Sequence, residues 1–457
     1  MSELIHGDIR KVILSLSWPT QVAFVLQAAF NLVDTIYIGR VSPDAIAALS
    51  LAFPVFVVMF SLAGGVGVGT TSLVARYLGA KRHRKANSVA QTSFLLAFVS
   101  TIAFMVLGYM FVEPLYIWMG AADSTLELAL SYTRTVLWGS VFMFFMIAAS
   151  SIIRGEGDTR TPMKYMIISS VINIVLDPLL IFGFWDFPKL GAQGAAIATN
   201  ISVAVGCYLS IRYLFKKKEK VRISLRGFRL DGPLIKRILE IGIPSSIAQS
   251  FMALGIIFLT KIVSTFGSDG IASYGIGYRL DMLAVLPALG ITLTMVTIVG
   301  HNIGAKKYFR AIKATINGSV LVAIQMGLVG LLFYLFPELF MQIFTNQKEV
   351  IKIGADYLST VGLTYGLIGI GMVIGAAFQG AGSATPLLAI TLARLVVLPI
   401  PIAYAYIYFI SESINGVWNA IAIANILSAV LAVGWLLLSS LYRRALASRE
   451  GSSESFF

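Results

Sequence analysis

Long hydrophobic runs recur along this chain, and short polar breaks separate them. Twelve runs are long enough to cross a lipid bilayer, which takes about 20 residues in an α-helix. They cover residues 11–38, 45–77, 87–111, 126–152, 161–184, 192–215, 234–266, 270–302, 312–336, 351–378, 386–410 and 417–441. The breaks hold turn-forming or charged residues, such as Glu113 and Pro114. The pattern therefore predicts an all-α membrane protein with twelve transmembrane helices.

Composition supports this class. Hydrophobic residues make up 57% of the 457 residues and charged residues 12%, about half the charged fraction of soluble proteins. The single cysteine, Cys207, excludes a disulfide framework, and three scattered histidines exclude a histidine metal cluster. The chain has neither an HExxH sequence nor a Walker sequence, so we expect neither an intramembrane enzyme nor an ATP-driven pump.

The basic residues alternate between the two sides of the predicted membrane. The N-terminus, every second loop after it and the C-terminal tail together hold 27 Lys and Arg, whereas the opposite loops hold four. Because Lys and Arg accumulate in cytoplasmic loops, both termini are predicted to be cytoplasmic, with the chain in the plasma membrane. The net charge of +13 is thus a topology signal and does not indicate nucleic acid. The polar start shows no signal-peptide pattern.

The two halves of the chain resemble each other at an offset of 225 residues. Pro19 corresponds to Pro244, and the sequence Gly79-Ala80-Lys81 recurs as Gly304-Ala305-Lys306. Other matched pairs are Ala86 with Ala311, Tyr132 with Tyr357, Gly157 with Gly382 and Asn200 with Asn425. Each half holds six spans, and an even number makes the two copies parallel. We therefore expect an N-terminal bundle (1–215), a cytoplasmic linker (216–233) and a C-terminal bundle (234–457) with a short basic tail, related by an axis along the membrane normal.

Polar residues at one depth of the N-terminal bundle are candidates for function. Asp34, Tyr132, Asp177 and Thr199 all lie roughly 8–12 Å below the predicted outer ends of their spans. Asn173 precedes Asp177 by four residues and shares its helix face. Two carboxylates in a low dielectric favour a bound proton, or a cation such as Na+ between them. The alternative is a polar cluster that only holds helices together.

The repeat separates these two interpretations. The positions that match Asp34, Asn173, Asp177 and Thr199 in the second half are Leu259, Leu398, Ile402 and Ala424. The shared architecture therefore does not require the polar residues, which favours a function for them.

The second half carries charges of its own. Lys261, Arg279 and Asp281 are expected to form an internal ion-pair network, with a substrate-facing role for Asp281 as the alternative. Arg394 is expected to be an ordinary helix-end or inner-face charge. Candidate substrate-facing residues are Asn31, Tyr37, Gln249 and Asp281.

Pro19 lies fifteen residues before Asp34 in the first span. A proline removes one helical hydrogen bond, so Pro19 is a candidate hinge, with a static kink as the alternative.

The chain resembles the multidrug and toxic compound extrusion (MATE) transporters. The resemblance rests on Ser17-Trp18-Pro19, on the paired Gly-Ala-Lys sequences, and on the loop 154–162 with its partner 379–386. The acids are similar to those of the archaeal and DinF-like branch. This resemblance implies a coupling site for H+ or Na+ made by Asp34, Tyr132, Asn173, Asp177, Ala195 (through its carbonyl) and Thr199.

The resemblance also implies a function. Such transporters export amphipathic, often cationic, organic compounds in exchange for H+ or Na+, with a V-shaped pair of bundles and a bending first helix. No cofactor and no catalytic residue are expected; the expected contacts are substrates, coupling ions and lipids around a monomer. The NorM-like branch carries acids in its seventh and tenth helices, where this chain offers Gln249 and no acid. A flippase for lipid-linked oligosaccharides is the alternative, but few basic residues lie deep in the spans.

Overall fold

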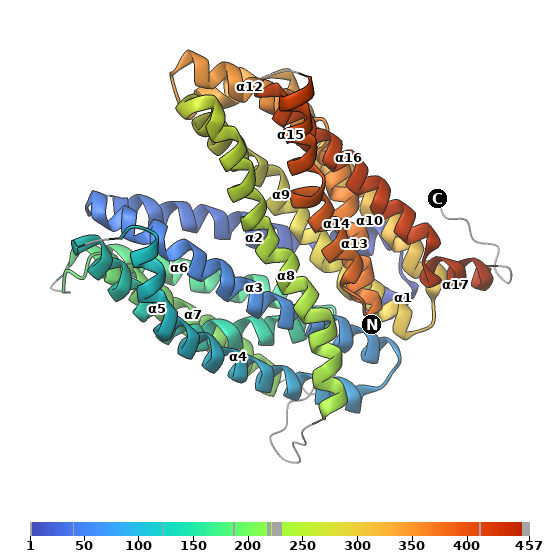
Figure 1. Ribbon diagram of the computed structural model, residues 1–457. Coiled ribbons are helices and arrows are strands. Elements are labelled where there is room, and N and C mark those ends of the chain that lie inside the picture. Colours follow the sequence, from blue (N-terminus) through green and yellow to red (C-terminus); the bar gives the residue numbers. More distant parts are fainter. Residues whose placement is uncertain are drawn as a thin grey trace. The chain divides into compact units, whose positions relative to one another are not determined.

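The computed structural model describes residues 2–39, 41–121, 123–185, 188–216, 221, 231–410 and 413–449, without the side chains of residues 2, 29–36, 39, 43, 123 and 449. In these ranges all regular structure is helical, as Figure 1 shows. The helices of the first half are α1 (Ser2–His6), α2 (Ile9–Gly39), α3 (Pro43–Gly79), α4 (His83–Trp118), α5 (Asp123–Gly155), α6 (Arg160–Phe182) and α7 (Ala192–Lys216).

The second half repeats this arrangement with more interruptions. Its helices are α8 (Gly232–Val263), the 3-10 helix η1 (Ser264–Phe266), α9 (Gly267–Gly304), α10 (Tyr308–Leu335), α11 (Pro337–Gln342), α12 (Lys348–Gly362), α13 (Tyr365–Ala381), α14 (Thr385–Leu392), the π-helix η2 (Ala393–Val397), α15 (Pro399–Phe409), α16 (Asn415–Leu438) and α17 (Ser440–Arg449). Each of the twelve predicted spans coincides with one helix or with a broken helix.

The described helices are long and apolar enough for a membrane protein. Nine helical segments of the described residues pass as candidate spans, and α12 and α13, bent by 50°, make a tenth if they form one broken span. The segment Gly232–Gly304 counts once among these although it contains both α8 and α9. The chain is therefore a multi-pass membrane protein.

Local chemistry explains how some helices start and end. The Asp8 carboxylate accepts the Lys11 N–H at 2.9 Å before the first turn of α2, and this bond lowers the pKa of Asp8. The Ser42 side chain accepts the Ala45 N–H at the start of α3. The predicted break at Pro114 is wrong, because α4 continues through it to Trp118. A proline removes only one backbone donor, and one more turn completes the helix.

The repeat is visible in the backbone. Lys81 and Lys306 both follow the end of a long helix and adopt a positive φ, of 58° and 60°. The preceding alanines close these helices with the same bonds, Ala80 N–H to Arg76 and Ala305 N–H to His301. Side chains other than glycine rarely adopt this conformation, so its recurrence at an offset of 225 shows that the two halves are built alike.

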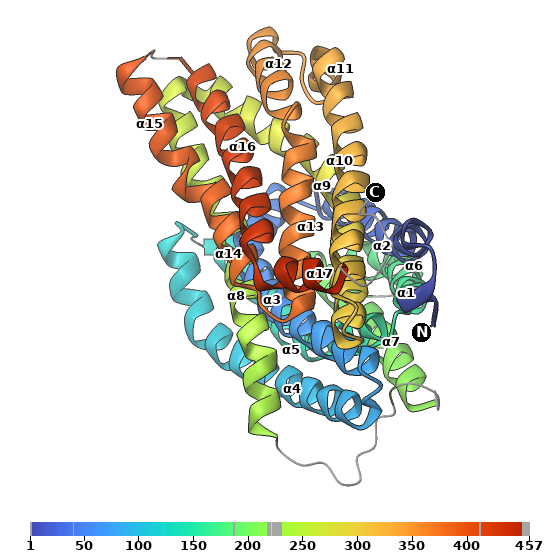
Figure 2. The same cartoon turned by 90° about the vertical axis from the view of Figure 1, so that its right-hand side faces the viewer.

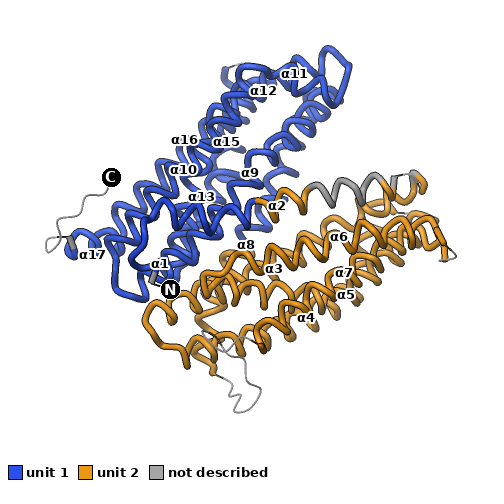
Figure 3. Tube along the Cα trace, turned by 180° about the vertical axis from the view of Figure 1, so that it is seen from behind, with its two compact units in different colours: residues 1–21, 247–457 blue, residues 22–246 orange. Residues whose placement is uncertain are grey.

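Contacts divide the chain into two compact units, shown in Figure 3. Unit 2 comprises residues 22–246, and unit 1 comprises residues 1–21 and 247–457. The boundaries fall inside α2 and α8, two residues after Pro19 and two residues after Pro244. They are therefore related by the same offset of 225. Most of the predicted linker 216–233 lies outside the described residues.

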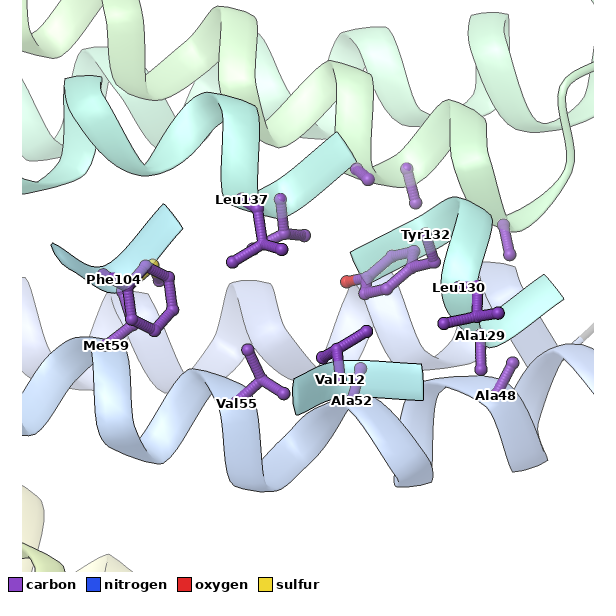
Figure 4. Close-up of a cluster of buried hydrophobic side chains, with 14 of the residues drawn as sticks. Ala48, Ala52, Val55, Met59, Phe104, Val112, Ala129, Leu130, Tyr132 and Leu137 are labelled. Carbon is purple, nitrogen blue, oxygen red and sulfur yellow. The ribbon is translucent and has the colours of Figure 1, made fainter. Parts of the chain in front are cut away.

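Unit 2 is a bundle in which α3 to α7 run side by side (Figure 1). Its apolar core joins Met59 of α3, Phe104 of α4, Leu137 of α5 and Ile181 of α6. Figure 4 shows part of this cluster. Alanines fill many of the buried positions of α3, so the helix axes can approach closely.

In unit 1, α13 packs against α9, α10 and α16 (Figure 2). A buried apolar cluster joins Ile312 of α10, Phe378 of α13, Ile390 of α14 and Leu436 of α16. The N-terminal residues belong to this unit: Lys307 Nζ donates to the Ile5 carbonyl at 3.2 Å, and Arg10 Nε donates to Asn317 Oδ1 at 3.1 Å.

Candidate functional site

Helix α6 carries two of the predicted site residues on one face. Asn173 and Asp177 are four residues apart, so their side chains lie one turn apart. The Asn173 amide donates to Asp177 Oδ1 at 3.0 Å. The helix ends at Gly183, whose φ of 75° lets its N–H close the last turn on Leu179. Asp177 is 1% exposed, within a predicted span.

Helix α7 adds a hydroxyl to this pair. Asn173 Nδ2 also lies 3.4 Å from Thr199 Oγ1. The structure thus brings together Asn173, Asp177 and Thr199, with a carboxylate, an amide and a hydroxyl at one level of the α6–α7 pair. We call these three residues the α6–α7 site.

Small residues on α7 allow this approach. Gly194, Ala198, Ser202 and Gly206 recur every four residues and are all buried. A Cβ on Gly194 would lie 2.4 Å from the Leu180 carbonyl oxygen, so only glycine fits there. Ser169 of α6 donates to the Ser202 carbonyl at 2.6 Å. Close packing and interhelical hydrogen bonds of this kind hold helices together in membranes. The spacing of small residues is a signal in the sequence for this contact, although the predicted site did not include it.

Tyr132 and Ala195 lie in the apolar cluster of unit 2. Tyr132 is 4% exposed, and its ring centroid is 6.1 Å from that of Phe56. Figure 4 shows Tyr132 among Ala52, Val112 and Leu130. Ala195 is buried in the same cluster, on the helix that carries Thr199.

The remaining predicted residues are placed as follows. The side chains of Asn31 and Asp34 lie outside the described residues, although the backbone there belongs to α2. Tyr37 is half-buried, with its ring centroid 6.2 Å from that of Phe182. Pro19 is buried and Gln249 is half-buried.

The α6–α7 site offers hard oxygen ligands in an apolar helix pair. A buried carboxylate either takes a proton or keeps a cation close, because an isolated charge is costly in a low dielectric. The carboxylate of Asp177 and the hydroxyl of Thr199 are also ligand types that a hard cation prefers, and Asn173 turns its amide nitrogen towards both. The arrangement can therefore hold a proton or a small cation.

A second polar cluster lies in unit 1, around Asp281 of α9. Tyr357 of α12 donates its hydroxyl to Asp281 Oδ2 at 2.6 Å, and Tyr365 of α13 donates to Asp281 Oδ1. The predicted ion-pair network is wrong: Lys261 and Arg279 are exposed, and no ion pair among the described residues joins them to Asp281. Arg279 precedes Asp281 by only two residues, so the two side chains do not share a helix face.

Arg394 also belongs to this cluster, which corrects its assignment as an ordinary helix-end charge. It lies in η2, the π-helix that interrupts the α14–α15 span. Its guanidinium is close enough to Asp281, Tyr278 and Tyr357 to interact with them electrostatically. π-helical turns frequently occur at functional sites, but a hydrophobic pattern does not reveal them.

Sequence comparisons agree with the fold. The MatE family model matches residues 19–179 and 244–405, one copy in each half of the chain. The probable multidrug resistance protein YoeA of Bacillus subtilis is 28% identical over 421 residues, or 91% of each chain. The probable multidrug resistance protein NorM of Thermotoga maritima is 28% identical over 448 residues, or 98% of this chain and 96% of the relative.

Solved structures agree as well. The crystal structure of a MATE protein in the bent conformation has a TM-score of 0.90 and 30% sequence identity, and the match covers 99% of each chain. With the family model matched in both halves of a multi-pass helical chain, the protein belongs to the MatE family of multidrug efflux transporters and is not an enzyme.

Proposed function

We propose that the protein exports amphipathic, often cationic, organic compounds in exchange for H+ or Na+, and that the α6–α7 site binds the coupling ion. The observation that carries this proposal is Asp177, a carboxylate 1% exposed in a membrane span and hydrogen-bonded by Asn173. The repeat position of Asp177 in unit 1 is Ile402. A carboxylate that the shared architecture does not need is best explained by a function.

The ion acts by changing a charge. With no ion bound, the carboxylates of Asp177 and Asp34 favour conformations that hydrate them. A bound proton or Na+ lowers their combined charge from −2 to −1 and favours a drier packing of the same helices. The ion therefore shifts the equilibrium between two conformations by its different affinity for each. Substrate leaves when the conformation with low affinity for it is favoured.

Pro19 is the proposed hinge of this change. The unit boundary lies two residues after it, so α2 changes its packing partners at the proline. Before the boundary, Thr294 Oγ1 donates to the Leu16 carbonyl at 3.3 Å, and Gln21 Nε2 donates to Gln325 Oε1 at 3.1 Å. These bonds hold the first part of α2 in unit 1, while the residues after Gln21 belong to unit 2.

Further parts of the proposal rest on the sequence. We infer that the chain belongs to the archaeal and DinF-like branch, because Asn173 and Asp177 stand together in α6. We also infer that both termini are in the cytoplasm, from the distribution of Lys and Arg. A monomer in the plasma membrane is inferred from the resemblance to the MATE transporters.

Transport by purified protein tests the proposal. Proteoliposomes receive a pH gradient and a Na+ gradient separately, and the movement of a fluorescent cationic dye is followed. Ion-driven transport should fall roughly 10- to 100-fold in Asp177→Asn, the loss expected when hydrogen bonds to a charged group are removed.

Glu113→Gln is the matched control. Glu113 is an exposed acid of unit 2, 3.1 Å from Arg134, with both side chains 50% exposed, and such pairs contribute little. Wild-type dye transport by Asp177→Asn under both gradients would refute the coupling role. Movement of a lipid-linked oligosaccharide instead of the dye would favour a flippase.

A further inference from the structure

Asp281 is the charged centre of the polar cluster in unit 1, and its acceptor oxygens are already occupied. Tyr357 donates to one carboxylate oxygen and Tyr365 to the other. The two tyrosines are 2% and 1% exposed, so both bonds are shielded from solvent. Asp281 therefore does not need a further cation to satisfy its hydrogen bonds.

The repeat shows that this cluster is specific to unit 1. Tyr357 corresponds to Tyr132, and Asp281 corresponds to Phe56. In unit 2 the ring of Tyr132 lies beside the ring of Phe56, 6.1 Å between centroids. The same pair of positions is thus aromatic in one unit and a carboxylate–phenol pair in the other. Since the shared fold works without the acid, the cluster is better explained by ligand binding than by helix packing.

Arg394 is the member of the cluster that has no hydrogen-bond partner among the described residues. It is half-buried in a span, yet it forms no hydrogen bond and no ion pair of 4.0 Å or less with any described residue. A guanidinium has five N–H donors and no acceptor, and a cation within a membrane span is costly unless it is paired. The negative charge of Asp281 attracts the guanidinium of Arg394, but the two groups form no direct ion pair.

Trp418 of α16 provides a second unsatisfied donor beside this cluster. It is fully buried, and its indole N–H has no hydrogen-bond partner among the described residues. Its ring packs on Tyr357 with 4.9 Å between centroids, and α16 also packs against the π-helix that carries Arg394. Indole N–H groups usually find a partner when they are buried.

The Arg394 guanidinium carries donors and no acceptor, so the partner that it lacks among the described residues is an acceptor. We propose that Arg394 binds the carboxylate of an organic substrate, and that Asp281, Tyr357 and Tyr365 hold the neighbouring surface in place. A planar guanidinium binds a carboxylate through two parallel hydrogen bonds. This inference rests on the proposed export of small organic compounds and narrows their class: zwitterionic substrates with a carboxylate are preferred over pure cations.

Two dyes of the same skeleton test this preference. One is a rhodamine with a free carboxylate, and the other is the methyl ester of that rhodamine, which keeps the cationic ring system. Fluorescence anisotropy measures the binding of each dye to the purified protein in phosphatidylcholine nanodiscs. The wild-type protein should bind the free carboxylate more tightly than the ester, by about tenfold or more.

Arg394→Gln should remove this difference. It should weaken binding of the carboxylate dye roughly 10- to 100-fold and leave the ester almost unchanged. Arg394→Lys should recover part of the preference, because it keeps the charge without the planar fork. Arg279→Gln is the matched control, because Arg279 is an exposed arginine on the helix that carries Asp281.

Three outcomes would overturn the proposal: equal wild-type affinity for both dyes, an equal effect of Arg394→Gln on both, or an effect on neither. A fourth outcome is that the preference for the carboxylate dye is present in phosphatidylcholine nanodiscs and absent in phosphatidylglycerol nanodiscs. This outcome would assign the site to a lipid headgroup and would also overturn the proposal. The wild-type comparison needs no variant, so poor folding of Arg394→Gln does not prevent a decision. No ion gradient is present, so failure of the coupling proposal leaves this result unaffected.

Discussion

Single side chains decide what the α6–α7 site can hold. Asn173 lies within hydrogen-bond distance of both Asp177 and Thr199, and it orients one of its donors between a carboxylate and a hydroxyl. A proton needs only the carboxylate. A metal cation needs several oxygens at once. The hydroxyl of Thr199 therefore distinguishes the two ions better than the carboxylate does.

Thr199→Val removes the hydroxyl and keeps the shape of the side chain. If Na+ is the coupling ion, Na+-driven dye transport should need a Na+ concentration roughly 5- to 30-fold higher, because one neutral oxygen ligand is lost. Transport driven by a pH gradient should change little. Thr199→Ser keeps the hydroxyl and is the control. Equal loss in both variants would show that Thr199 acts through packing alone.

At the scale of helices, close helix packing and interruptions of the helices have different structural roles. The contact between α6 and α7 depends on Gly194, whose place no larger residue can take without a shift of Leu180. The π-helix η2 carries Arg394. The bend between α12 and α13 is followed by Tyr365, which contacts Asp281. Regular helices thus form the framework, and irregular turns position the polar side chains of unit 1.

Gly194→Ala tests the packing of α6 on α7. The added methyl group would lie 2.4 Å from the Leu180 carbonyl oxygen, so the helices must separate, at a cost of about 1–3 kcal/mol. Thermal unfolding in detergent should show a lower midpoint. Gly434→Ala in α16 is the control, because a Cβ there meets no atom within 4 Å. An unchanged midpoint for Gly194→Ala would mean that the helices are not tightly packed.

Pro19→Ala tests the hinge in α2. Alanine restores a backbone donor at the unit boundary and stiffens the helix, so ion-driven dye transport should fall while dye binding persists. Pro244→Ala, at the matching boundary in α8, should act in the same direction. Pro114→Ala is the control, because α4 lies entirely in unit 2. Wild-type transport by Pro19→Ala would identify a static kink.

At the scale of the whole molecule, the distribution of basic residues predicts the orientation. Thiol labelling in intact cells checks it in a Cys207→Ser background, which removes the single, buried native cysteine. A membrane-impermeant reagent should label Gln347→Cys, an exposed residue before α12, and should label Ser448→Cys of α17 only after lysis. Labelling of Ser448→Cys in intact cells would reverse the predicted topology.

The sequence by itself determined the spans, the repeat and the membrane class. These depend on the length and the order of apolar residues, because every backbone group in a bilayer must bond within a helix. Because the spans must be helices, the spacing of four residues also placed Asn173 and Asp177 on one helix face, so their pairing could be predicted. The small residues of α7 could have extended this prediction to Thr199.

Only the tertiary structure decided which partners Asp281 and Arg394 have. Tyr357 and Tyr365 follow Asp281 by 76 and 84 residues and stand on two helices joined by a bend. No periodicity relates such positions, and the π-helix around Arg394 leaves no trace in an apolar pattern. The division of α2 and α8 between the units also came from packing, because a proline marks where a helix can bend but not which neighbours it meets on either side.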